Sequence, residues 1–192
     1  MALARYVVGV LLVVSMPPAI LWWILLHPLV AFWRRLGARR AMGVVSVLMV
    51  AMAVALVPCR DALLGRNLGT TWVLVAVAAC LTAGAAALAV WRRRFLDSRI
   101  LSGMPELEGD ARRLLTEGPY ALVRHPRYVE VALWTFAYAC FSNYVGAYVL
   151  AVLTLPLLHV VVLLEERELA ARFGAAWAEY RARVPRYVPR PR

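Results

Sequence analysis

Residues 128–164 have the sequence YVEVALWTFAYACFSNYVGAYVLAVLTLPLLHVVVLL. Two apolar segments, 128–141 and 144–164, are separated by Ser142-Asn143, a pair typical of tight turns. The second segment has the roughly 20 residues that a helix needs to cross a bilayer. The first has about 14, which span only about 21 Å in a helix. We therefore predict a helical hairpin in the membrane. Its shorter arm either begins inside the preceding loop or crosses obliquely, so that its backbone hydrogen bonds stay internal.

Similar apolar segments precede the hairpin at residues 6–26, 41–57 and 71–91, the first with a predicted kink at Pro17-Pro18. Of the 192 residues, 63% are hydrophobic, which exceeds the roughly half that is usual in a soluble domain. The sequence predicts a single all-α integral membrane domain with about five transmembrane helices. Its parts are three N-terminal spans in 1–91, a cytoplasmic loop in 92–127, the hairpin in 128–164, and a cytoplasmic C-terminal helix and tail in 165–192.

All 22 basic residues are Arg, and they lie in short clusters beside the apolar segments. With five crossings, 19 of the 22 fall on the side that holds the loop at 92–127 and the C-terminus. The positive-inside rule then places that side in the cytoplasm and the N-terminus outside. Such clusters fit anionic lipid headgroups, so the net charge of +11 does not predict nucleic-acid binding. The absence of Lys indicates a GC-rich bacterial genome, and hence the bacterial inner (plasma) membrane.

The N-terminus and the cysteines bear on two other interpretations. The apolar stretch at 6–26 is long and no A-x-A cleavage site follows it, so we predict a retained span and not a signal peptide. Cys59, Cys80 and Cys140 have neither CxxC nor metal-ligand spacing, so the sequence predicts no disulfide framework and no metal site. No feature of the sequence predicts the oligomeric state.

Polar residues gather at two places that the predicted topology puts on the same side. One is GPYALVRHPRY at 118–128, and the other is Glu165-Glu166 at the end of the fifth apolar segment. A hairpin brings these two places together. Taken one at a time, the residues also fit a turn at Gly118, Arg anchors in the lipid headgroups, a structural His, an aromatic belt and a solvated helix turn.

The order and spacing of these residues resemble a known family. GPYALVRHPRY, then the apolar hairpin, then LLEERELAARFGAAWAEYRARVPRYVP, is similar to the C-terminal signature of the isoprenylcysteine carboxyl methyltransferase family. Phospholipid methyltransferases share a looser version of it. The resemblance covers residues 116–189. It implies a membrane methyltransferase that uses S-adenosyl-L-methionine at the cytoplasmic face, with a lipophilic or prenylated acceptor that arrives from the bilayer.

The resemblance also implies which residues form the site. Those expected to take part in the reaction are Arg124, His125 and Glu165, and those expected to bind the cofactor are Gly118, Tyr120, His125, Pro126, Tyr128, Glu165 and Glu166. The carboxylates can accept hydrogen bonds from ribose hydroxyls or the amino group, and Arg124 can bind the cofactor carboxylate or an acidic acceptor. The Tyr rings can stack on adenine or face the sulfonium. His125 can bind the cofactor or take a proton from the acceptor.

Two positions depart from the family pattern. The family commonly has a small residue where this chain has Glu130. A carboxylate at a membrane boundary is costly and tends to be functional. Glu130 is therefore expected to contact either the cofactor amino group or Arg124, or to mark an altered pocket or a different acceptor. The second departure is Trp177, where a Tyr is more usual; one aromatic residue for another is expected to matter little.

Two other functions remain open at this stage. A nicotinamide-dependent membrane reductase of the sterol type shares an RHPxY-like element but is a much longer chain, and a small non-catalytic membrane scaffold needs no cofactor. The acceptor is also open among an isoprenoid carboxylate, a phenolic or pyrone lipid, a phospholipid amine and a hydrophobic thiol. His159, Asn143 and Trp134 either line a tunnel for this acceptor or pack within the hairpin.

Overall fold

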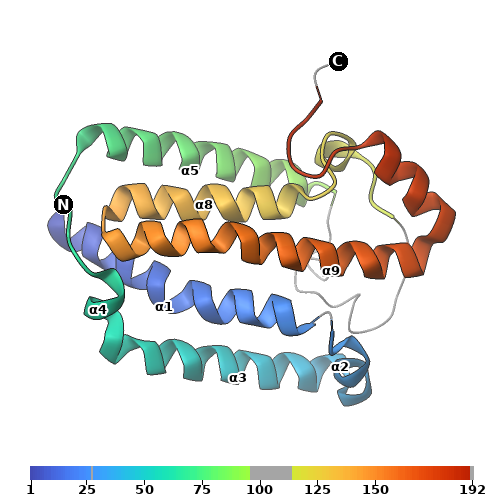
Figure 1. Ribbon diagram of the computed structural model, residues 1–192, viewed down its shortest axis with the longest axis horizontal. Coiled ribbons are helices and arrows are strands. Elements are labelled where there is room, and N and C mark those ends of the chain that lie inside the picture. Colours follow the sequence, from blue (N-terminus) through green and yellow to red (C-terminus); the bar gives the residue numbers. More distant parts are fainter. Residues whose placement is uncertain (27, 96–113, 191–192) are drawn as a thin grey trace.

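The computed structural model describes residues 1–26, 28–95 and 114–190 as a bundle of helices along a common axis (Figure 1). The α-helices and the two short 3-10 helices (η) are α1 (Ala2–Leu26), α2 (Val30–Leu36), α3 (Ala38–Leu56), η1 (Val57–Cys59), α4 (Arg60–Leu64), α5 (Trp72–Arg93), η2 (Gly118–Ala121), α8 (Pro126–Ser142) and α9 (Val145–Arg183). These residues form no strand, and the bridge between Asn67 and Tyr144 is isolated. The all-α prediction is confirmed.

The predicted membrane segments coincide with helices. Within the described residues, four stretches are long and apolar enough to cross a membrane, namely α1, Ala38–Leu64, α5 and α9. The shorter hairpin arm is α8, which has 17 residues and so measures about 26 Å. It begins at Pro126, inside the preceding loop, which is one of the two expected alternatives. Because α8 packs against α1, α5 and α9, neighbouring helices surround much of this short helix.

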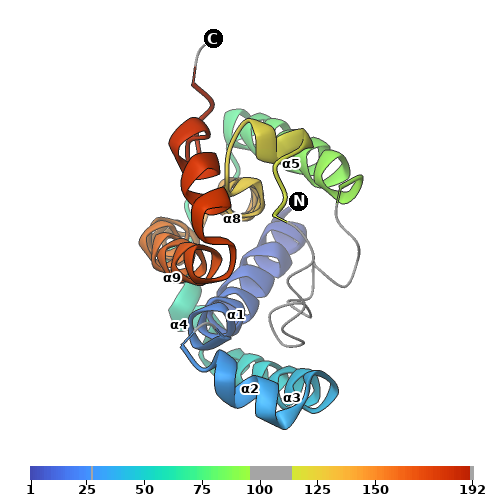
Figure 2. The same ribbon diagram turned by 90° about the vertical axis from the view of Figure 1, so that its right-hand side faces the viewer.

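The longer hairpin arm continues well past the predicted end of the fifth span. Helix α9 runs through Glu165 and Glu166 without a break, and its backbone first leaves the helical region at Gly174, with φ 50° and ψ −119°. This left-handed conformation strains a residue with a Cβ but not glycine. The bend turns the last part of α9 back over the start of α8 (Figure 2). The C-terminal helix therefore begins at this bend and not at residue 165.

Helices α1, α3, α5, α8 and α9 alternate in direction along the bundle. Consequently α2, the start of α3, the end of α5 and the start of α8 lie at the same end as the C-terminal tail (Figures 1 and 2). Their Arg residues share that end, as the five-crossing prediction requires. The centre of the predicted loop, residues 96–113, lies outside the described residues.

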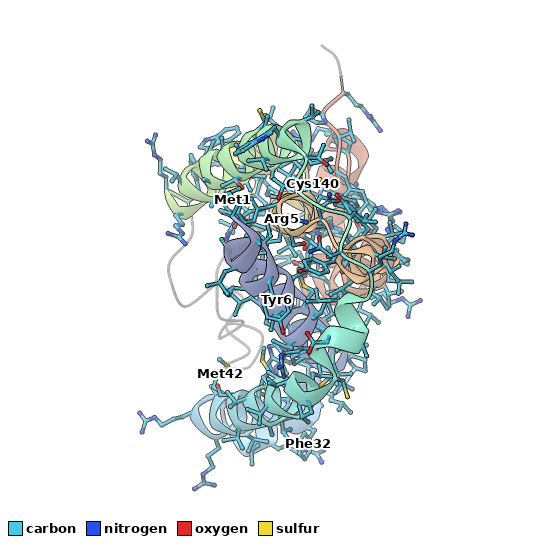
Figure 3. All side chains as sticks on the ribbon, turned by 90° about the vertical axis from the view of Figure 1, so that its left-hand side faces the viewer. Met1, Arg5, Tyr6, Phe32, Met42 and Cys140 are labelled. Carbon is cyan, nitrogen blue, oxygen red and sulfur yellow. The ribbon has the colours of Figure 1, made fainter. Side chains whose placement is uncertain are left out.

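The opposite end is organised by a buried arginine. Arg5 is 3% exposed and is labelled in Figure 3, which looks onto this end. Its guanidinium donates hydrogen bonds to the Ser142 carbonyl (3.1 Å), Thr70 Oγ1 (3.0 Å) and Asn67 Oδ1 (2.8 Å). Asn143 follows in the left-handed conformation, with φ 54°. Asn143 was expected either to line a tunnel for the acceptor or to pack within the hairpin, and the structure places it in the turn of the hairpin.

Candidate functional site

The RHP segment and the C-terminal tail lie side by side at the end shown in Figure 2. The Arg124 amide donates to the Pro185 carbonyl over 2.8 Å, and the His125 amide donates to the Arg186 carbonyl over 3.1 Å. Pro126 then occupies the first turn of α8, where a missing N–H costs nothing. Two segments about 60 residues apart in sequence thus form one unit, which explains why their motifs occur together.

Glu166 is the centre of the polar site. Its carboxylate accepts hydrogen bonds from Arg124 Nη2 (3.0 Å) and from Arg186 Nη2 (2.9 Å), and it lies 3.1 Å from His125 Nε2. Glu166 is 6% exposed and His125 is 3% exposed. A charge this buried is tolerated only when it is paired and hydrogen-bonded, as it is here. In the structure, the Glu166 carboxylate is bound by side chains of the protein itself. The expected contact between Glu166 and the cofactor stays a prediction.

Arg124 links the RHP segment to the end of α9. Its Nη1 donates to the carbonyl oxygens of Arg181 (2.7 Å) and Val184 (2.9 Å), and its guanidinium lies 5.7 Å from the ring of Trp177. Arginine commonly binds the free carbonyls at a helix C-terminus in this way. Together with the bond from Nη2 to Glu166, these contacts hold the Arg124 side chain against the end of α9.

The buried polar atoms at this end that have no hydrogen-bond partner among the described residues include Glu165 Oε2, Arg124 Nε and Trp177 Nε1. Glu165 Oε2 lies 3.7 Å from His125 Nδ1, which is too long for a hydrogen bond. Buried polar atoms without partners are rare and call for a ligand or ordered water. A carboxylate acceptor and two N–H donors at the same end of the bundle fit a molecule that carries an amino group, hydroxyls and a carboxylate.

Gly118 and Tyr120 both lie in η2, which precedes the RHP segment. Gly118 has φ 58°, and a Cβ on it would clash with the ring of Phe95. The Tyr180 hydroxyl donates to the Tyr120 carbonyl over 2.7 Å, which ties η2 to the part of α9 beyond the bend. Burial raises the pKa of Tyr120 to about 12. Its side chain is therefore an uncharged phenol at neutral pH.

Glu130 is paired with an arginine that the sequence did not single out. Its Oε2 accepts hydrogen bonds from Arg92 Nε (2.9 Å) and Nη2 (2.8 Å). Arg92 is the penultimate residue of α5 and is 5% exposed. This partner differs from Arg124, one of the two expected contacts, and the expected contact with the cofactor amino group stays a prediction. In the sequence, Arg92 is one Arg of a cluster at the end of a predicted helix, and Glu130 is a single carboxylate near the start of another. Nothing in the sequence indicates that these two residues form a pair.

An apolar groove of about 640 Å³ lies between α5, α8, α9 and the tail. Its lining is almost entirely hydrophobic and consists of Val77, Leu81, Tyr128, Val129, Ala132, Leu133, Phe136, Cys140, Leu155, Leu158, His159, Tyr187 and Val188. Tyr128 and Tyr187 connect the groove to the polar site, because their rings lie 5.8 and 6.4 Å from the ring of His125. Of the two expected roles, lining a tunnel for the acceptor or packing within the hairpin, His159 has the first, since it lines the groove. Trp134 packs against Tyr138.

The chain is thus a helical integral membrane protein in which a buried polar site adjoins an apolar groove. Residues 73–176, more than half of the chain, match the phospholipid methyltransferase family. The chain belongs to this family. The match includes α5, the RHP segment, Glu165 and Glu166, and the bend at Gly174.

A protein-S-isoprenylcysteine O-methyltransferase of Schizosaccharomyces pombe (strain 972) is 31% identical over 77 residues. The aligned part covers 40% of this chain and 33% of the yeast protein, so the chain spans about a third of the curated relative that it matches. No solved structure matches the chain. These similarities support a membrane methyltransferase and confirm the resemblance seen in the sequence.

Proposed function

We propose that this protein transfers a methyl group from S-adenosyl-L-methionine to a lipophilic acceptor that reaches the site through the apolar groove. The observation that carries this proposal is the junction of two unlike environments. The buried polar site around Glu166 has polar atoms without partners, and the groove that meets it at Tyr128 and Tyr187 is apolar. A charged methyl donor needs a polar site and a lipid acceptor needs an apolar groove, and the two must be in contact for methyl transfer.

Glu165, Trp177, Tyr120 and His125 are the residues that would hold the cofactor. Glu165 Oε2 is a buried acceptor for an amino or hydroxyl group, and Trp177 Nε1 is a buried donor for a carboxylate. The uncharged Tyr120 ring can stack on adenine or face the positive sulfonium. When bound, the cofactor supplies a methyl group on a positively charged sulfur.

The remaining contacts hold this arrangement rigid and keep water out. Glu166 fixes Arg124, His125 and Arg186, and the bend at Gly174 brings Trp177 over the site. For an in-line displacement with a good leaving group, alignment of donor and acceptor is a large share of what a protein can contribute. Exclusion of water also protects the reactive donor.

The family match favours a methyltransferase over the nicotinamide-dependent reductase and the non-catalytic scaffold. The Arg clusters at the same end support a cytoplasmic site, by the positive-inside rule. We therefore propose the cytoplasmic face of a bacterial inner membrane as its location. Green fluorescent protein fused to the C-terminus should fluoresce in bacterial cells; a dark, full-length fusion would place this end outside.

The cofactor is tested by isothermal titration of S-adenosylhomocysteine into the purified, detergent-solubilised chain. We expect binding to the wild type and a loss of about tenfold to a hundredfold for Glu165→Gln, since a hydrogen bond to a charged group is worth about 1.5–3 kcal/mol. His125→Ala should also bind weakly. The matched control is Glu179→Gln, an exposed carboxylate of α9 that should bind normally. Folded wild type that binds no S-adenosylhomocysteine would contradict the proposal.

A further inference from the structure

One polar pair lies inside the apolar groove. His159 of α9 and Tyr187 of the tail both line it, with 2.7 Å between His159 Nδ1 and the Tyr187 hydroxyl. Burial raises the pKa of Tyr187 above its usual value. Its hydroxyl therefore stays protonated at neutral pH and shares a hydrogen bond with His159 Nδ1. An ionisable side chain within a membrane-spanning helix is costly, and its presence generally has a functional reason.

The pair lies at the end of the groove that meets the polar site. The ring of Tyr187 is 6.0 Å from that of His159 and 6.4 Å from that of His125. Its neighbour in sequence, Arg186, binds Glu166 directly. From Tyr128 to Cys140 the groove follows α8 for about 18 Å at 1.5 Å per residue. An acceptor whose apolar chain fills this length would have its head group at His159 and Tyr187.

The charge of the lining limits what that head group can be. None of the described lining residues is an Arg, and the chain contains no Lys. Arg124 and Arg186 lie nearby, but both donate to Glu166, and Arg124 also donates to two carbonyl oxygens. A carboxylate in the groove would therefore find no guanidinium among the described lining residues, and a buried charge that is not paired is unfavourable. An uncharged head group with one O–H could both accept a hydrogen bond from the His159–Tyr187 pair and donate one to it.

We propose that His159 and Tyr187 bind the hydroxyl of a long-chain phenol and receive its proton, so that the acceptor of the proposed methyl transfer is a phenolic lipid. The phenol oxygen forms a bond to the methyl carbon while the carbon–sulfur bond of the donor breaks, and that electron pair stays on sulfur. The phenol proton passes to Tyr187 Oη as the Tyr187 proton passes to His159 Nδ1. An uncharged phenol has a pKa of about 10, so a base accelerates its reaction, whereas a carboxylate needs none.

The first test is acceptor binding, which does not require turnover. A long-chain phenol and a carboxylic acid with the same chain are titrated into the full chain saturated with S-adenosylhomocysteine. We expect the phenol to bind at least tenfold more tightly than the acid, and Tyr187→Phe to reduce that preference. The matched control is Tyr148→Phe, which removes a hydroxyl that donates to Asn143 Oδ1 at the other end of the bundle. Preference for the carboxylate would overturn the inference.

The second test separates proton transfer from packing. Methyl transfer is measured for ring-substituted phenols of increasing acidity, with wild type, His159→Phe and Tyr187→Phe. General base catalysis is worth about a hundredfold or more, so the variants should lose about that factor with the least acidic phenol and little with phenols already ionised. An equal loss for every phenol would mean a structural role and refute the relay.

The inference rests on the proposed function, and the two fail differently. If the wild-type protein does not bind S-adenosylhomocysteine, both the proposed methyl transfer and the assignment of a phenolic acceptor are refuted. Wild type that binds S-adenosylhomocysteine and methylates the carboxylic acid but not the phenol removes only the assignment of His159 and Tyr187.

Discussion

Removal of one partner from the Arg92–Glu130 pair should destabilise the protein far more than removal of both. The pair joins the end of α5 to the start of α8 through bonds of 2.8 and 2.9 Å. The side chains are 5% and 12% exposed. Either partner left alone is a buried charge without a counter-ion, and water cannot compensate for it fully.

The magnitude follows from that burial. Breaking a buried ion pair from one side costs about 3–5 kcal/mol, whereas replacing both partners by apolar residues of similar volume is often neutral or stabilising. We expect Arg92→Met and Glu130→Leu each to lower the free energy of unfolding by about 3–5 kcal/mol. The double variant should remain within about 1 kcal/mol of the wild type.

The assay is thermal unfolding of the four proteins in one detergent. For a chain of this length, about 1 kcal/mol corresponds to roughly 2–4 °C in Tm, so each single variant should unfold about 6–20 °C lower. The exposed Arg183–Glu179 pair, at 68% and 72% exposure, is the matched control. It should be worth less than about 1 kcal/mol. Single effects that simply add in the double variant would refute the reasoning, since they would show that the two charges do not depend on each other.

Three further changes test other parts of the structure. Gly118→Ala should lower the free energy of unfolding by at least about 1–2 kcal/mol, because φ is 58° there and Phe95 blocks a Cβ; an unchanged Tm would contradict this. Arg5→Met should lower it by about 3 kcal/mol or more, since several hydrogen bonds from one charged donor are lost, and a wild-type melting curve would show that they contribute nothing. Glu166→Gln should speed trypsin cleavage after Arg186 about tenfold, because a charge-assisted hydrogen bond to the tail is weakened; equal cleavage rates would mean that Glu166 does not hold the tail.

Much of the site was predictable because its motif residues lie close together in sequence. Hydropathy predicted the spans, and a turn at Ser142-Asn143 predicted that 118–128 and Glu165-Glu166 meet. The two carboxylates could not be told apart, because adjacent residues on a helix point in directions about 100° apart. Only the packing shows that Glu166 binds three side chains while Glu165 Oε2 has no hydrogen-bond partner among the described residues.

Contacts that do not follow from the predicted hairpin could not be predicted. Arg92 belonged to an ordinary Arg cluster, and nothing in the sequence related it to Glu130, which follows 38 residues later. Arg186 and Tyr187 were part of the C-terminal motif but were not selected. Their roles depend on the tail running beside Arg124 and His125, and that path begins at the bend at Gly174.

Sequence patterns were enough to predict an all-α membrane protein, the end of the bundle that carries the polar residues, and the family. Hydrophobic runs of bilayer length, clustered charge and a specific motif are local properties of a chain, so they can be found in the sequence. Tertiary structure alone decided which carboxylate is paired, how Glu130 is neutralised, and that His159 faces Tyr187 in the groove. These are properties of side chains brought together from distant segments, and their energies depend on burial and on distances of a few ångströms, which exist only once the chain has folded.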